Sequence, residues 1–333
     1  MSLFALHNMA KKILRIGTRE SPLAVWQAQQ VQNLLHKAGV ESQLVYIKSE
    51  GDTDTITPLY ALGVQGIFTK TLDAALLNNR IDIAVHSMKD VPVQMAEGIR
   101  QAAVLKRGSY KDVFVYKDET DLEKLGFVNN EWSLIQRSKF TIHDSRFIIA
   151  TSSIRRIAQW LHRYPDTEIE NLRGNVNTRL NKVKTHNWNG AIFAAAGLER
   201  INLRPENAID LDWMLPAPAQ GAIVAVCRKD EENTFSNCQS FNDEATAICA
   251  KIERDFLKKL MGGCSMPISA LAQISNNNIV FKGNVLSVDG KEKAEIEKRI
   301  EKSKANDLGL IAGEEILKRG ADKIIEQIRH ASR

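Results

Sequence analysis

The chain has 333 residues, which is long enough for two or three domains. Its formal net charge is +5, and its 44% hydrophobic and 26% charged residues are ordinary for a globular protein. Basic and acidic residues are interspersed, which argues against a nucleic-acid-binding tail and favours small anionic ligands. No apolar run approaches the roughly 20 residues of a membrane span. The apolar stretch at residues 3–6 is too short for a secretory signal, and Met9 is an alternative start. We therefore expect a cytoplasmic protein with neither nucleic-acid nor membrane partners.

Predicted strands and helices alternate through the first two thirds of the chain. The pattern predicts strands at 14–19, 43–49 and from 81, with helices at 23–38 and 68–79. A similar unit has strands at 147–151, 168–172 and 190–195, a helix capped by Ser152 or Ser153, and a helix at 176–184. This order predicts an α/β protein with parallel sheets covered by helices on both faces, that is, doubly wound domains.

The remaining segments predict how the domains are joined. The Pro-rich stretch 215–221 reads as an interdomain crossing, followed by a strand at 223–227 and a helix at 242–261. The tail predicts strands at 268–274 and 279–286, with a third strand possible, and helices at 307–318 and 321–330, forming a small α+β C-terminal domain. We predict domain 1 over 1–110 and 221–240, domain 2 over 111–216 and domain 3 over 242–333. The polar stretch 119–145 is expected to be an irregular insertion.

The segment from Ile81 to Pro92 carries the first chemical signal. It begins as a fully apolar strand and ends in a polar cluster closed by proline, which cannot continue a sheet ladder. In open α/β sheets, ligands bind at the carboxyl ends of the strands. Asp90 beside Lys89 and His86 is therefore a candidate for acid/base or cation-stabilising chemistry. A structural aspartate that caps the turn is the alternative, and both interpretations stay open here.

Several arginines lie where predicted strands turn into helices: Arg19, Arg155, Arg156, Arg173, Arg179 and Arg200. The arginine fork binds carboxylates in a bidentate fashion, and helix N-termini add N–H donors. A single arginine of this kind is usually a surface salt bridge. Their recurrence at equivalent positions of two sheets indicates a ligand with several carboxylates.

The four cysteines, Cys227, Cys238, Cys249 and Cys264, match no C-x-x-C metal pattern. We expect the first three to be reduced thiols, partly buried. Cys264 follows two glycines and precedes Ser265-Met266-Pro267, so an exposed loop should present its thiol for covalent attachment or nucleophilic work.

Six ordered segments resemble the porphobilinogen deaminase (hydroxymethylbilane synthase) family. They are RIGTRESPLA (15–24), VHSMKDVP (85–92), TSSIRR (151–156), LRGNV (172–176), PAPAQGA (216–222) and GGCSMPI (262–268). The similarity runs from about residue 14 into the third domain. It implies two domains that resemble hinged periplasmic-binding-protein domains, with a cleft between them.

The resemblance also implies a chemistry. Family members carry a dipyrromethane cofactor on a thioether to the loop cysteine, which matches Cys264. They join four porphobilinogen molecules head to tail on it and release hydroxymethylbilane and ammonia, in tetrapyrrole and heme biosynthesis. The catalytic aspartate matches Asp90, no metal is implied, and a monomer is expected.

The remaining site residues are also carried over by matching. The expected cofactor-binding residues are Ser87, Lys89, Ser152, Ser153, Arg155, Arg156 and Asp52. The expected substrate-binding residues are Arg19, Ser21, Gln27, Phe68, Arg173 and Arg179.

One departure from the family pattern lies in the lid loop. The family commonly has Gly-Gly-Lys-Gly before the loop phenylalanine, and this chain has Val64-Gln65 between Gly63 and Gly66. This raises the alternative of a degenerate deaminase that binds without turning over. A non-catalytic binding module is the other alternative, because the same architecture serves solute receptors. It would leave Asp90 together with Cys264 unexplained.

Overall fold

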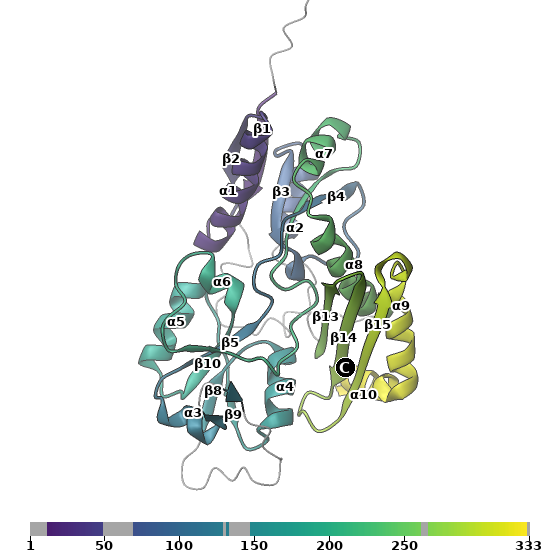
Figure 1. Ribbon diagram of the computed structural model, residues 1–333. Coiled ribbons are helices and arrows are strands. Elements are labelled where there is room, and N and C mark those ends of the chain that lie inside the picture. Colours follow the sequence, from purple (N-terminus) through teal and green to yellow (C-terminus); the bar gives the residue numbers. More distant parts are fainter. Residues whose placement is uncertain (1–11, 49–68, 129–130, 133–146, 261–265, 332–333) are drawn as a thin grey trace, which may run out of the picture.

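A computed structural model of the protein describes residues 12–48, 69–128, 131–132, 147–260 and 266–331. Its main elements form two mixed five-stranded sheets and one antiparallel three-stranded sheet, each with its own helices (Figure 1). This confirms the predicted fold class of two α/β units with a small third α+β unit. The residue limits of the three domains stay predictions.

The first sheet has the strand order β2-β1-β3-β12-β4. The strands are β1 (Leu14–Thr18), β2 (Ser42–Tyr46), β3 (Ile83–Ser87), β4 (Ile99–Val104) and β12 (Ile223–Arg228). β1 pairs in parallel with β2 and β3, whereas β12 runs antiparallel to both β3 and β4. The three strands predicted to be parallel, β1, β2 and β3, are parallel, and β12 makes the sheet mixed. The chain returns to this sheet beside the end of β3, where the Met88 N–H donates to Ala222 O at 3.0 Å, so β12 must run in the opposite direction.

Helices cover both faces of the first sheet, as predicted. Helix α1 (Pro22–Lys37) begins after Ser21 with proline at its first position, and Gly39 adopts a φ of 76° just past its end. Its buried Val31 and Leu35 pack with the β1 and β3 side chains on one face. Helix α2 (Lys70–Leu77) packs Leu72 and Leu76 on the other face. A further helix, α7 (Glu232–Gln239), follows β12.

The second sheet has the order β11-β5-β10-β8-β9 and the same mixed character. Its strands are β5 (Asp112–Tyr116), β8 (Ile148–Ala150), β9 (Glu168–Glu170), β10 (Gly190–Ala194) and β11 (Ala208–Asp210), and its helices α4 (Ile154–Arg163), α5 (Val176–Thr185) and α6 (Ala195–Glu199). β10, β8 and β9 are parallel, and β5 is antiparallel to β10 and β11. The three predicted strands, β8, β9 and β10, are thus parallel, and β5 makes this sheet mixed as well.

The prediction of an irregular insertion at 119–145 is wrong for the first part of this stretch. The chain forms helix α3 (Thr120–Lys124), which Gly126 follows with a φ of 77°, and then the hairpin strands β6 (Phe127–Val128) and β7 (Glu131–Trp132). Local turn chemistry accounts for this order, because the Asp118 carboxylate accepts from the Thr120 N–H at 3.0 Å at the helix start. Residues 129–130 and 133–145 of the insertion lie outside the described residues.

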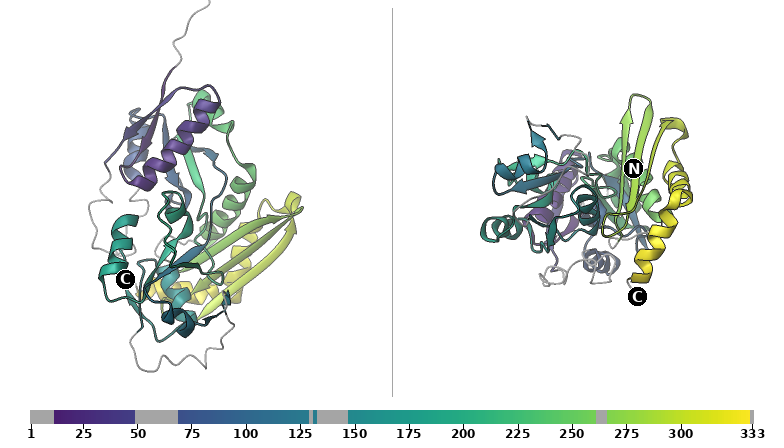
Figure 2. Two further views of the ribbon diagram at one scale, coloured as in Figure 1. Left: turned by 60° about the vertical axis from the view of Figure 1, so that its left-hand side comes forward. Right: turned by 90° about the horizontal axis from the view of Figure 1, so that it is seen from below.

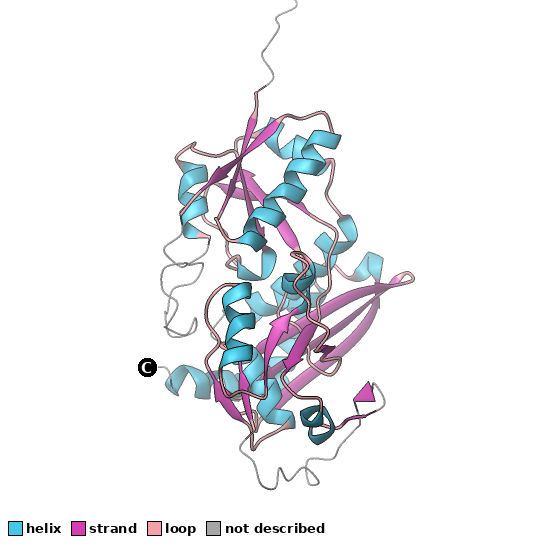
Figure 3. Cartoon of the chain, turned by 90° about the vertical axis from the view of Figure 1, so that its left-hand side faces the viewer, coloured by secondary structure: helices cyan, strands magenta, loops and turns pink. Residues whose placement is uncertain are grey.

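The third sheet consists of β13 (Ile268–Ser275), β14 (Asn278–Leu286) and β15 (Lys293–Glu301), all antiparallel. It shares one hydrophobic core with α8 (Glu244–Lys259), α9 (Leu308–Ile316) and α10 (Asp322–Ala331). Figure 2 shows the long strands of this unit beside the two α/β units. Figure 3 shows the helices and strands of all three from another side.

A buried carboxylate joins the third unit to the first. Glu253 of α8 has no exposed surface, and Arg107 binds it through Nη1 at 2.6 Å and Nη2 at 3.1 Å. Its oxygens also accept from the Ala219 N–H at 2.6 Å and the Ala272 N–H at 2.8 Å. Because four donors satisfy this charge, α8, β13 and the segment before β12 are held in a fixed arrangement.

Candidate active site

The turn after β3 carries Lys89 and Asp90. It is a single 3₁₀ turn (Met88–Asp90) that follows the buried strand β3 and is anchored by Met88, only 2% exposed. Arg254 of α8 binds this turn from the third unit. Its Nη1 donates to Val91 O at 2.9 Å and its Nη2 to Pro92 O at 2.6 Å. The carboxyl end of β3 is therefore held in place by a buried cation from another part of the fold.

Lys89 connects the first sheet to the second through Gln220. The Lys89 ammonium donates to Gln220 Oε1 at 3.3 Å. The amide nitrogen of Gln220 donates in turn to Asp112 Oδ1 at 3.0 Å and to Tyr110 O at 2.7 Å. Gln220 is almost fully buried, so this chain of hydrogen bonds crosses between the two α/β units away from solvent.

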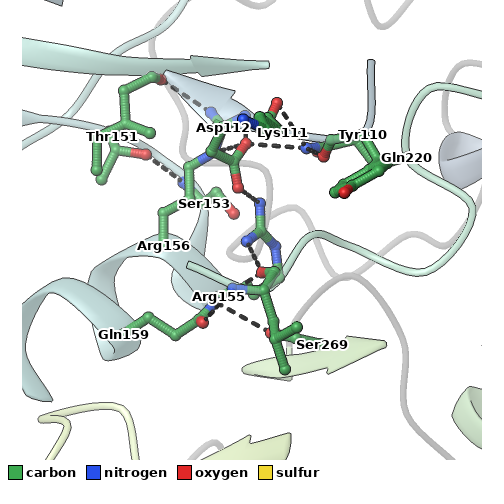
Figure 4. A network of polar contacts seen from close by, with 12 residues as sticks. Tyr110, Lys111, Asp112, Thr151, Ser153, Arg155, Arg156, Gln159, Gln220 and Ser269 are labelled. Atoms are coloured by element: carbon green, nitrogen blue, oxygen red, sulfur yellow. Dashed lines mark hydrogen bonds and ion pairs between the residues drawn. The ribbon is translucent and has the colours of Figure 1, made fainter. Parts of the chain in front are cut away.

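Asp112 is the centre of a buried network at the first position of β5 (Figure 4). Arg155 Nη2 binds its Oδ2 at 2.7 Å, and Arg156 binds its Oδ1 through Nη2 at 2.8 Å and Nε at 3.1 Å. Both arginines lie in the first turn of α4 and are at most 7% exposed. Their ion pairs with Asp112 are therefore buried, and the ordinary interpretation of a single arginine as part of a surface salt bridge does not apply to them.

Burial and neighbouring charges shift the pKa values of Asp112 and Lys89 in this network. Burial raises the pKa of Asp112, but Arg155 and Arg156 outweigh it and hold the pKa at about 2. Burial lowers the pKa of Lys89 to about 8, against the opposing effect of Asp90 and with Arg156 adding to the decrease. Lys89 thus remains mostly an ammonium at neutral pH and loses its proton just above it.

The second α/β unit adds Arg173 and Arg179, which interact with each other, and Arg179 also interacts with Asp90. Burial lowers the pKa of Arg179 to about 10, with Arg156 and Arg173 lowering it further and Asp90 raising it. Arg179 Nε donates to Gly174 O at 2.7 Å, and Asn175 caps α5 by accepting from the Thr178 N–H at 2.9 Å. Arg173 is 4% exposed. The Asp90 carboxylate therefore lies within electrostatic range of cations from both sheets.

The start of α1 contributes a further group of predicted residues. Gln27 is buried and donates to Ser87 Oγ at 2.8 Å, which ties α1 to the end of β3. Burial lowers the pKa of His86 to about 3, and Arg19 adds to this effect, so Arg19 is close enough to interact with it. His86 is therefore neutral at physiological pH and supplies no positive charge beside Asp90.

The Ser152 side chain has backbone hydrogen-bond partners, whereas the Ser153 side chain makes no capping hydrogen bond. Ser152 Oγ donates to Leu172 O at 2.7 Å and accepts from the Leu172 N–H at 2.9 Å, which joins the ends of β8 and β9. Ser153 is the N-cap residue of α4. Ser21 holds the same position at α1. Their expected contacts with a cofactor or substrate stay predictions.

The structure brings together most of the predicted site, namely Asp90, Lys89, Ser87, Gln27, Arg19, Arg155, Arg156, Arg173 and Arg179. Asp52, Phe68 and Cys264 lie outside the described residues, as do Val64 and Gln65 of the predicted lid. The other three cysteines are free and buried, as expected, and burial raises the pKa of each thiol. Within the described ranges, no group of His, Cys, Asp and Glu residues could hold a metal ion.

Sequence reasoning missed Asp112, Gln220 and Arg254. Asp112 precedes an apolar run, Val113 to Tyr116, so it looks like an ordinary residue at a strand start. Gln220 was visible only as part of the PAPAQGA motif, and Arg254 occupies one turn of a charged helix. Their partners come from elements far apart in the sequence, so spacing alone carries no signal for them.

Comparison with known proteins identifies the family. Residues 14–236 match the family model "Porphobilinogen deaminase, dipyromethane cofactor binding domain", and residues 247–318 match "Porphobilinogen deaminase, C-terminal domain". The chain belongs to the porphobilinogen deaminase family. It is a tetrapyrrole-biosynthesis enzyme with a dipyrromethane cofactor, as the motifs predicted, and porphobilinogen is its substrate.

Some solved structures are more distantly similar. The methionine-binding protein MetQ is 12% identical over 70% of this chain and 91% of its own, with a TM-score of 0.41. A double mutant of the Bordetella pertussis BvgS VFT2 domain is 11% identical over 68% and 85%, with a TM-score of 0.40. The family assignment does not depend on these similarities. No helix within the described ranges has the length and apolar character needed to cross a membrane.

Proposed function

We propose that the deaminase reaction takes place between the carboxyl end of β3 and the arginine-bearing starts of α4 and α5, with Asp90 as the catalytic carboxylate. The observation that carries this is the placement of Asp90 within electrostatic range of Lys89 and Arg179, which come from different sheets. The Asp90 carboxylate is carried by a turn that Arg254 anchors, so its position is fixed by another part of the fold.

Asp90 acts on the positive charge of the reaction. When porphobilinogen loses its amino group, the C–N bond breaks, ammonia leaves with that electron pair, and positive charge spreads into the pyrrole ring. A fixed carboxylate near the ring N–H stabilises this charge, because it needs no reorganisation at the moment of reaction. After the new C–C bond forms, the α-proton is lost, and the same carboxylate can accept it.

The residues of this region fit the cofactor and the growing chain. Each pyrrole carries an acetate and a propionate, so the ligand needs several cations at fixed positions. Lys89, Arg173, Arg179 and Arg19 supply them, and the arginine fork binds carboxylates in a bidentate manner. The dipyrromethane, when bound, supplies the α-carbon on which the chain grows. We propose Cys264 as its point of attachment, with Asp52 and Phe68 as further contacts.

Arg155 and Arg156 have a different role in this proposal. Arg155 donates from Nη1 to Leu215 O at 2.6 Å and from Nη2 to Asp112 at 2.7 Å. Arg156 likewise donates to Asp112 and to Ile192 O. They hold the Asp112–Gln220 pair and through it Lys89, which would bind a carboxylate of the cofactor. Loss of either arginine then disturbs cofactor binding through Lys89 as well as directly.

Turnover with porphobilinogen tests the proposal. Purified protein should release ammonia and hydroxymethylbilane in a ratio of four to one, read by an ammonia assay and by the absorbance of the porphyrin formed after cyclisation and oxidation. A protein that binds porphobilinogen but releases no ammonia would instead be the binding module or the degenerate deaminase. We also propose that the protein is a monomer and that it is cytoplasmic, and the buried free thiols support the location.

A further inference from the structure

A cavity lies between the second and third units, outside the proposed catalytic region. Its volume is about 350 Å³, which falls in the range of small-molecule pockets, and such pockets favour the boundaries between domains. Its lining includes Gln159, His162, Arg163 and Trp213 of the second unit, and Asn284 and Lys293 of the third. The last turn of α4 thus faces the cavity, whereas Arg155 and Arg156 lie in the first turn of that helix.

Direct contacts between the two units hold the walls of this cavity in place. Because a carbonyl oxygen only accepts, His162 Nδ1 donates to Gly290 O at 2.7 Å, in the turn between β14 and β15. A Cβ on Gly290 would approach Ala158 O within 2.6 Å, so this turn packs directly on α4. Gln159 Nε2 donates to Ser269 Oγ of β13 at 3.0 Å (Figure 4). The site is therefore preorganised by contacts of its own.

Asn284 brings an unpaired polar group to the cavity. Its side chain is 4% exposed, and its Oδ1 has no hydrogen-bond partner in the part of the chain that the structure describes. Buried polar groups are nearly always paired, because leaving one unpaired carries its full desolvation cost. A primary amide both accepts and donates, and a hydroxyl group does the same. A ligand hydroxyl is therefore the group that suits this position.

Positive charge lies beside this amide. In the register of β14 and β15, Lys293 lies opposite Leu286, two residues after Asn284, so the Lys293 and Asn284 side chains share one face of the sheet. The Lys293 ammonium pairs with Glu295, whose side chain is mostly exposed. Because such a pair contributes little, Lys293 can bind another anion.

Arg163 supplies the second cation, from the opposite wall. Its guanidinium lies 5.0 Å from the centre of the Trp213 ring, and its Nε donates to Tyr164 Oη at 3.0 Å. None of the described residues that line the cavity is a carboxylate. The lining therefore combines two cations with one buried amide.

We propose that this cavity binds a small hydroxylated dicarboxylate. Asn284 pairs with the hydroxyl group, and Lys293 and Arg163 bind the two carboxylates. This ligand contacts α4 of the second unit and the third sheet at the same time, so it should also raise the melting temperature. The proposal does not rest on the deaminase mechanism, because no lining residue has a role in it.

Isothermal titration of the full-length enzyme with L-malate and with succinate, which lacks only the hydroxyl group, tests the proposal. We expect L-malate to bind about threefold to tenfold more tightly, which is the effect of one hydrogen bond. Asn284→Leu should abolish this preference. Lys293→Gln should weaken both acids, most clearly at low ionic strength. Lys291→Gln is the matched control, at a more exposed lysine of the same turn that does not line the cavity, and it should change neither affinity.

The hydroxyl preference distinguishes the cavity from the catalytic arginines, which also bind carboxylates but do not contact Asn284. Equal affinities of the unaltered enzyme for the two acids, or a preference that Asn284→Leu retains, would overturn the proposal, because the buried amide would then have no ligand hydroxyl as its partner. Equal losses in Lys293→Gln and Lys291→Gln would also overturn it, since they would indicate general surface electrostatics. The melting temperature controls for folding, and Lys293→Gln keeps the test decisive if Asn284→Leu folds poorly.

Discussion

Arg254 lies 2.9 Å from the carbonyl oxygen of Val91, through Nη1, although the two residues are 163 positions apart. The same side chain donates to the carbonyls of Pro92 and, at longer range, Met88 and Val93. Helix α8, which carries Arg254, ends at Lys259, five residues before Cys264 in the sequence. One helix of the third unit therefore holds the turn that carries Asp90 and precedes the proposed attachment point of the cofactor.

Removing this contact should impair turnover more than binding. Arg254→Met leaves buried carbonyl groups unpaired, at a cost of about 1–3 kcal/mol, and frees the turn that positions Asp90. We expect kcat to fall by roughly tenfold to a hundredfold, as for other misplaced catalytic groups, with a much smaller change in KM. Arg254→Lys should recover part of the loss. A lowered melting temperature with normal kcat would reduce Arg254 to a structural residue.

Asp90→Asn keeps the shape of the side chain and removes its charge. Loss of a preorganised electrostatic group typically costs about a hundredfold to a thousandfold in kcat. The assay is steady-state formation of hydroxymethylbilane by variant enzyme whose cofactor content is known. Glu97→Gln, at an exposed position beyond the same turn, is the control for loss of one carboxylate. Near-normal activity of Asp90→Asn would disprove the assigned role.

The pH dependence of KM for porphobilinogen should report the protonation of Lys89. Its buried ammonium has a pKa of about 8, so the charged form is lost as the pH rises through that value. If the charge binds carboxylates, KM for porphobilinogen should rise above pH 8. Lys89→Arg should remove this rise, because a guanidinium stays protonated, and Lys111→Arg should not, since Asp210 and Asp212 raise the pKa of Lys111.

The lowered pKa of Lys89 also affects the folding stability of the protein. The pKa of Lys89 is lower in the folded chain than in the unfolded one, so the unfolded state binds more protons between about pH 8 and 10.5. The contribution of this group to folding stability therefore increases as the pH rises across that window. Denaturant titrations of the unaltered enzyme and Lys89→Met at both ends of the window measure it. An identical pH dependence in the two proteins would contradict a buried, depressed ammonium.

In the proposed function, Arg155 connects cofactor binding to the buried Asp112 network. Arg155→Leu removes one of two cations from Asp112, and breaking such a buried pair costs about 3–5 kcal/mol. We expect less folded protein and a large fraction without cofactor, measured by intact mass. Arg155→Lys should rescue only partly, because a point charge cannot bridge Asp112 and Leu215 O. Full cofactor loading and turnover in Arg155→Leu would refute the connection.

Local patterns account for what was predictable in this fold. Proline at position 22, Gly39 and the apolar run before Ser87 place α1 and β3 correctly, because each acts on its own neighbours in the chain. The direction of β12 was not predictable, since it follows from where the crossing segment re-enters the sheet. The Asp112 network was missed for the same reason, because its donors come from residues 43, 44 and 108 positions away.

The central claim is that this enzyme builds its product on a covalent dipyrromethane at Cys264, and intact-mass spectrometry tests it most directly. The protein as isolated should exceed its sequence mass by two pyrrole units, which peptide mapping should place on Cys264. Added porphobilinogen should give a ladder of single-pyrrole increments, and Cys264→Ala should lose both the excess mass and the activity. An active preparation of unmodified mass, or an adduct on Cys238, would contradict the account.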